Sequence, residues 1–96
     1  MRNRLVLGVY ENAYESLIVC ANEIIKDNKF CISQIWQSEE DYDKVGIGFF
    51  KKDDERNYER VQLIKEDNII YLEIEEDADR FGHNATELMD IYNKIK

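Results

Sequence analysis

The chain has 96 residues, of which 44% are hydrophobic and 35% are charged. This composition suits one small folded domain spanning 1–96 and argues against a disordered segment. Twenty-one acidic residues against thirteen basic ones give a net charge of −8, which argues against direct binding to nucleic acid or to an anionic membrane. A basic protein is the partner that this charge favours, although an acidic surface is also a common means of staying soluble.

The first ten residues contain a short alternating run in which Leu5, Leu7 and Val9 share one side. This alternation predicts a strand over 4–10, with an irregular lead-in to the first helix as the alternative. The apolar run is too short for an export signal or for crossing a bilayer, so we expect a cytoplasmic protein.

Two stretches have the spacing of an amphipathic helix, and they predict helices over 13–27 and 85–95. Asn12 followed by Glu15, and Asn84 followed by Glu87, resemble capping boxes at the two starts. The apolar stripes of the two helices are Tyr14, Leu17, Ala21, Ile24 and Ile25 in the first, and Leu88, Tyr92 and Ile95 in the second.

Between the helices the apolar period changes to two, which predicts four strands of a half-buried antiparallel sheet. The expected inward sides are Phe30, Ile32 and Trp36; Val45, Ile47 and Phe49; Val61 and Leu63; and Ile70, Leu72 and Ile74. The predicted fold class is α+β, with a sheet of four to five strands in the order β-α-β-β-β-β-α and both helices on one face.

The last two strands can be placed in register, because Asp67-Asn68 suits a two-residue turn. That turn puts Leu63 opposite Leu72 on one face and Ile64 opposite Tyr71 on the other, so that apolar residues meet apolar residues.

No residue pattern marks a catalytic centre, and we expect neither an enzyme nor a cofactor or metal site. His83 is the single histidine, and it precedes the second helix as a loop residue. Cys20 and Cys31 have no ligand-like spacing and are expected to be reduced thiols in a helix and a strand. The pair Gly46 and Gly48 lies within a strand pattern, which predicts a close backbone approach or a bend and not a phosphate loop.

The face of the sheet away from the helices is the predicted binding surface, because it mixes apolar residues with charge. The expected anchors are Phe50, Ile64 and Tyr71, and the expected acidic rim consists of Glu39, Glu40, Asp41, Asp43, Glu73, Glu75, Glu76, Asp77 and Asp79.

This profile, small, acidic, single-domain and without catalytic residues, is similar to that of bacterial toxin-immunity proteins and phage anti-CRISPR or anti-restriction proteins. The resemblance implies an inhibitor of a basic protein that handles nucleic acid, such as a nuclease or a nucleic-acid-binding complex. The alternative is a structural or regulatory homodimer joined through the open sheet face or an edge strand. A small enzyme or a metal-dependent binder that uses the carboxylates of 73–79 with His83 is a third reading.

Overall fold

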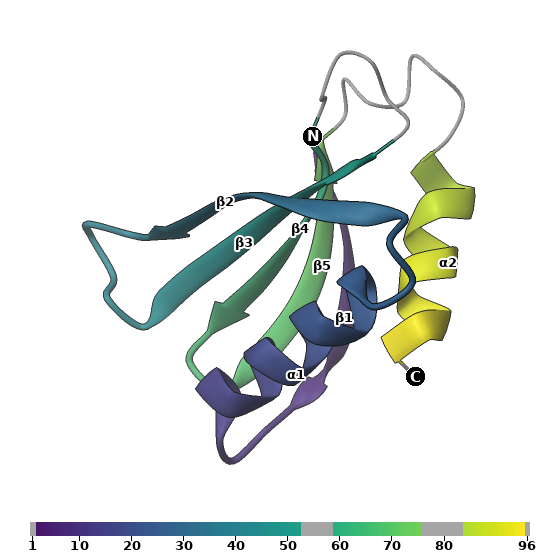
Figure 1. Ribbon diagram of the computed structural model, residues 1–96. Coiled ribbons are helices and arrows are strands. Elements are labelled where there is room, and N and C mark those ends of the chain that lie inside the picture. The colour runs from purple at the N-terminus through teal and green to yellow at the C-terminus, as the bar shows by residue number, and fades with distance from the viewer. Residues whose placement is uncertain (1, 53–58, 76–83, 96) are drawn as a thin grey trace.

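The alternating stretches form strands and the two amphipathic stretches form helices, as the computed structural model in Figure 1 shows. The structure describes residues 2–52, 59–75 and 84–95. Its elements are β1 (Arg2–Val9), α1 (Ala13–Ile25), β2 (Phe30–Gln37), β3 (Lys44–Lys51), β4 (Glu59–Glu66), β5 (Ile69–Glu75) and α2 (Asn84–Ile95). This order confirms the predicted α+β fold.

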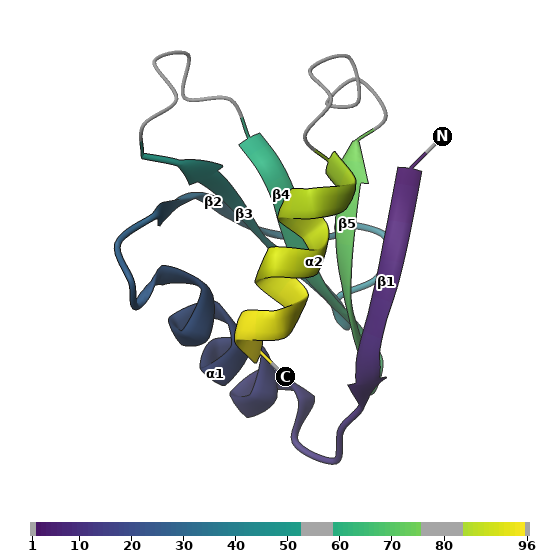
Figure 2. The same ribbon diagram turned by 90° about the vertical axis from the view of Figure 1, so that its right-hand side faces the viewer.

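The strands form one sheet of five strands in the order β1-β5-β4-β3-β2, and all four pairings are antiparallel. The N-terminal run therefore joins the sheet as a strand, as predicted. A register shift between Val6 and Gly8 interrupts its pairing with β5, and Val9 is 74% exposed, so the prediction that Leu5, Leu7 and Val9 share one side is wrong for Val9. β1 and β2 are the two terminal strands, and Figure 2 shows them on opposite sides of the molecule.

The hairpin of β4 and β5 has the predicted register. Leu63 pairs with Leu72 and Ile64 pairs with Tyr71. Asp67 adopts a positive φ of 53° in the connecting turn, a conformation that Asp and Asn tolerate better than most residues.

Both helices pack on the same face of the sheet and close the core. The central strands contribute Phe49, Leu63 and Leu72, which are fully buried. Helix α1 adds Ile24 and helix α2 adds Ile91, also without exposed surface.

Helix α1 differs from expectation at its N-terminal end. Leu17, Ala21 and Ile24 are buried as predicted, but Tyr14 is half exposed and does not belong to the buried stripe. The side chain of Asn12 makes no capping hydrogen bond, so the predicted capping box is wrong at this helix. The backbone carbonyl of Asn12 instead accepts the amide of Ser16 at 2.9 Å.

Strand β2 also departs from the simple alternation. A register shift between Ile32 and Gln34 interrupts its pairing with β3. Such a β-bulge adds one residue to one strand and exchanges the faces beyond it. Trp36 therefore lies on the face opposite to Ile32, and the prediction that Phe30, Ile32 and Trp36 share one side is wrong for Trp36.

The C-terminal ends of the two helical segments are joined by an ion pair between Lys94 and Asp27. The Lys94 ammonium lowers the pKa of Asp27, with help from the backbone amide of Lys29. Because the pKa is lowered in the folded state, this contribution to stability is present at neutral pH and is lost as the pH falls through the lowered value.

Candidate protein-binding surface

The sheet face away from the helices is covered in its centre by Trp36. Gly46 pairs with Trp36 across the β2–β3 ladder, and a Cβ atom on Gly46 would lie 2.2 Å from Cε2 of the indole. The indole Nε1 donates a hydrogen bond to Oε1 of Gln62 at 2.8 Å. The prediction that a glycine here marks a close approach is confirmed, and the approaching group is this ring.

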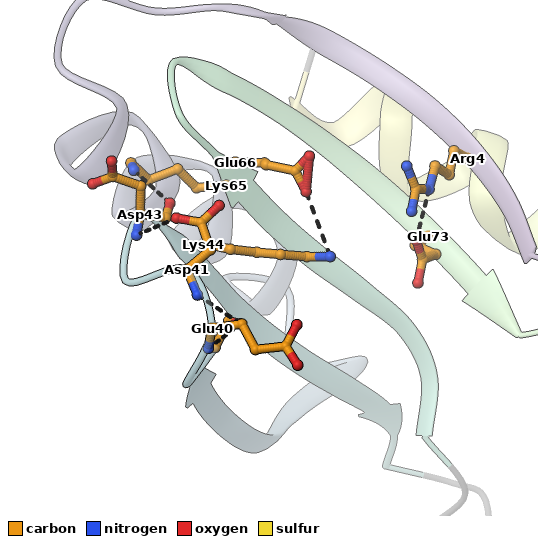
Figure 3. Close-up of polar contacts among 9 residues, drawn as sticks. Arg4, Glu40, Asp41, Asp43, Lys44, Lys65, Glu66 and Glu73 are labelled. Atoms are coloured by element: carbon orange, nitrogen blue, oxygen red, sulfur yellow. Dashed lines mark hydrogen bonds and ion pairs between the residues drawn. The ribbon is translucent and has the colours of Figure 1, made fainter.

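Arg4 covers the same face from the other end of the sheet. Its guanidinium carbon lies 4.7 Å from the centroid of the Tyr71 ring, and its Nε donates to Oε2 of Glu73 at 2.9 Å (Figure 3). The hydrogen bond to Glu73 raises the pKa of Arg4. The cation thus lies over an aromatic ring and beside a carboxylate, both favourable places for it.

Under these two side chains, three of the predicted binding residues are buried. Ile64 is 1% exposed, Tyr71 is 4% exposed and Glu73 is 2% exposed. Their prediction as surface anchors and rim is therefore wrong, because the molecule covers this face with its own Trp36 and Arg4.

Among the remaining predicted residues of that face, Phe50 is described with its side chain, whereas the others lie partly or wholly outside the described residues. Phe50 is half-buried and pairs with Cys31. The backbone of Glu75 ends β5, but its side chain lies outside the described residues. Glu76, Asp77 and Asp79 lie outside them entirely, as does His83.

The other predicted acidic group is exposed and forms a well-defined loop between β2 and β3. We call residues 38–43 the acidic loop; its exposed carboxylates are Glu39, Glu40, Asp41 and Asp43. The hydroxyl oxygen of Ser38 accepts the backbone amides of Glu40 at 3.3 Å and Asp41 at 3.2 Å. The Asp41 carboxylate accepts the amide of Asp43 at 3.0 Å (Figure 3).

Lys65 attaches the acidic loop to the body of the protein. This lysine is 4% exposed, and its ammonium donates to the backbone carbonyl of Asp43 at 2.8 Å. The same ammonium lies 4.4 Å from the centroid of the Tyr14 ring in α1. A buried ammonium needs such partners, and together they place the loop beside the N-terminal end of the helix.

An exposed apolar surface adjoins this loop on the helical side of the sheet. We call it the α1–β2 patch; it consists of Tyr14, Ile18, Ile32, Ile35 and Tyr42, which are between 41% and 71% exposed. Figure 1 shows α1 and β2 as neighbours joined by a short connection, and the two elements are in contact.

The members of the patch are brought together by three features. Tyr14 and Ile18 are four residues apart and share one side of α1. The Tyr14 hydroxyl lies 3.5 Å from the Tyr42 carbonyl. Ile32 and Ile35 pair with the core residues Phe49 and Ile47 and so point to the helical side, but they remain exposed because β2 is the last strand.

A cleft of about 550 Å³ borders the patch at the start of α1. The residues that line it include the acidic residues Glu11, Glu15, Asp43 and Asp67, together with Tyr14 and Lys65. Tyr14 belongs to both the cleft and the patch, so acidic and apolar surfaces are continuous here.

The described residues give no support for a metal site: they include no group of three or more His, Cys, Asp or Glu side chains that could hold an ion. Neither of the helical segments that the structure describes has the length and apolar character needed to span a bilayer.

The α1–β2 patch was not predicted, although the sequence contains two signals for it. Ile18 and Val19 follow the buried Leu17 directly, and one helix stripe cannot hold three consecutive residues. β2 is also the one strand of the five described whose sequence, FCISQIWQ, contains no charged residue.

Comparisons with protein-family models, curated proteins and solved structures find no match to this chain.

Proposed function

We propose that this chain is a non-enzymatic binding protein that docks onto a positively charged partner protein and inhibits it. The observation that carries the proposal is the α1–β2 patch, an exposed apolar surface that adjoins the acidic loop and the acid-lined cleft. A central apolar area beside charged residues is the usual anatomy of a protein interface.

The exposed apolar side chains are the first support. Single exposed apolar residues are normal on a protein surface, but five on α1, β2 and the acidic loop that follows β2 are not. Tyr14 and Tyr42 are the kind of residue that carries binding energy, because a tyrosine buries a large area and offers a hydroxyl to the partner.

The charge beside the patch is the second support. With a net charge of −8, the molecule attracts basic surfaces over a distance and repels nucleic acid. The acidic loop concentrates carboxylates next to the apolar anchors, and the acid-lined cleft has the chemistry to receive a lysine or arginine side chain.

A partner with a basic groove for nucleic acid would match both the apolar patch and the negative charge beside it. An acidic protein reaches such a groove quickly and competes with its natural ligand. We therefore infer inhibition of a nucleic-acid-handling protein, of the kind that toxin-immunity and anti-CRISPR or anti-restriction proteins perform. We also infer a cytoplasmic location, which the two cysteines favour because Cys20 and Cys31 are reduced thiols.

The test begins with affinity capture from a host lysate treated with nuclease, followed by identification of the retained protein by mass spectrometry. The Kd of the purified pair is then measured by calorimetry for wild type and for the variants Tyr42→Ser and Ile18→Ser. We expect each variant to weaken binding about tenfold or more. The complex should also lose affinity steeply as salt rises.

Val9→Ser is the matched control, because Val9 is 74% exposed on the opposite terminal strand and should leave the Kd unchanged. The captured protein should lose nucleic-acid binding when wild type is added, and less so with the Tyr42 variant. A partner that is acidic, an affinity that does not change with salt, or equal binding by the patch variants and wild type would each overturn the proposal.

A further inference from the structure

Terminal strand β2 lacks the charged residues and the proline that sheet edges often carry. Proteins commonly place lysine, other charges or proline on edge strands to prevent pairing with another chain. The opposite terminal strand, β1, contains Arg2 and Arg4, whereas the eight residues of β2 contain no charge and no proline.

The bulge in β2 limits where a further strand could pair regularly. After the register shift at Ile32 and Gln34, the pairing of β2 with β3 is continuous from Gln34 to Gln37. This regular half of β2 leads directly into the acidic loop and includes Ile35, which is 67% exposed.

We propose that the basic partner binds by adding an extended segment as a further strand along Gln34–Gln37 of β2. The proposal rests on the function proposed above and specifies the form in which the partner is recognised. In this mode backbone hydrogen bonds supply much of the affinity, and alternate side chains of the added strand find their own contacts.

One face and one end of the added strand would each contact a different surface of the protein. Alternate side chains point to the helical side, where Ile35 and Ile18 offer apolar contacts within the α1–β2 patch. The end of the segment beside Gln37 reaches the acidic loop, where lysine or arginine is favoured. The matching ligand is therefore an extended segment that combines apolar residues with basic ones.

A second copy of this chain is a poorer occupant on grounds of charge. Each copy carries −8, and side-by-side pairing would bring two acidic molecules together. A basic segment gains from the same field, so charge complementarity selects the partner over self-association.

The test uses a peptide of ten residues that alternates lysine and valine, and a second peptide with the same sequence in which every backbone amide is N-methylated. The two have the same charge and the same side chains, but the second has no amide on either edge that could donate the backbone hydrogen bonds of an added strand. Binding is measured by calorimetry, and the site is located by amide hydrogen exchange on the full chain.

We expect the unmodified peptide to bind at least about tenfold more tightly than the N-methylated one and to slow exchange at Ile35 and Gln37, whose amides point away from β3 in the antiparallel register. Exchange at Val6 in β1 should not change, which makes the charged edge an internal control. Ile35→Lys should weaken binding of the unmodified peptide, and Val9→Lys should not.

The other outcomes separate this inference from the proposed function. Equal binding of both peptides without protection of β2 would overturn strand addition and leave the basic-partner proposal standing. Failure of both peptides to bind, at a salt concentration where charge acts, would overturn the added strand and count against the proposed function as well. A dimer mass by light scattering, with β2 amides already protected before any peptide is added, would show that a second copy occupies the edge.

Discussion

The two sides of the sheet carry similar apolar residues and use them in opposite ways. On the side without helices, Ile64 and Tyr71 are buried under Trp36 and Arg4. On the helical side, Ile18 and Ile35 remain exposed although helices pack on that face. The comparison shows that the exposure of these apolar residues depends on a few covering side chains as well as on the strand pattern.

Among the changes at covering and exposed positions, the largest effect is expected at Gly46, which lies directly under the Trp36 ring. Gly46→Ala places a methyl group within the volume of the Trp36 ring, so the ring must move and lose its hydrogen bond to Gln62. We expect a loss of about 2–3 kcal/mol in the free energy of unfolding, measured by urea denaturation followed by circular dichroism. The fluorescence of Trp36 should shift to longer wavelength as the ring becomes more exposed.

A double-mutant cycle provides the control for this prediction. In a Trp36→Ala background, the Gly46→Ala change should cost less than about 0.5 kcal/mol, because the clashing ring is gone. Equal costs in both backgrounds would mean that Trp36 does not cover Gly46, and the contrast between the two sides would fail.

A smaller effect is expected at the other covering residue. Arg4→Met retains an apolar side chain but removes the hydrogen bond to Glu73 and the contact of the cation with Tyr71. Since Glu73 is almost fully buried, loss of this partner should cost about 1–3 kcal/mol, again by urea denaturation. Adding Glu73→Gln to Arg4→Met should recover part of the loss, because no buried charge then remains; no recovery would contradict the role given to this pair.

The smallest effect is expected on the exposed side. Ile18→Ala should change the free energy of unfolding by less than about 0.5 kcal/mol, as is usual for surface positions. Ile24→Ala, in the same helix but fully buried, should cost about 2–5 kcal/mol. A large cost at Ile18 would mean that the α1–β2 patch is part of the core and is not kept for binding.

The sequence was sufficient to predict the fold because local patterns and pairing agree. One antiparallel sheet order is favoured by the alternation in β1, by the Asp67-Asn68 turn, and by the apolar cross-strand pairs Leu63–Leu72 and Ile64–Tyr71. The helices followed from apolar spacing, and their boundaries differ from prediction by two residues or fewer.

The binding surface could not be predicted in the same way, because it depends on tertiary contacts. The bulge after Ile32 reverses the side of Trp36, and no alternation rule places an extra residue. Arg4 and Glu73 are 69 positions apart, so their pairing depends on β1 lying beside β5. Tyr14 was assigned to the core by spacing, yet it faces Lys65 at the end of the helix.

The way in which the acidic loop is held has a thermodynamic consequence for any partner. Ser38 and Asp41 fix its backbone from within, and Lys65 fastens it to the sheet. The backbone entropy of this segment, about 1–2 kcal/mol per residue, is therefore lost during folding and not during association. Its carboxylates extend from a preorganised backbone, so the entropy cost of forming a complex is smaller than it would be for a flexible loop.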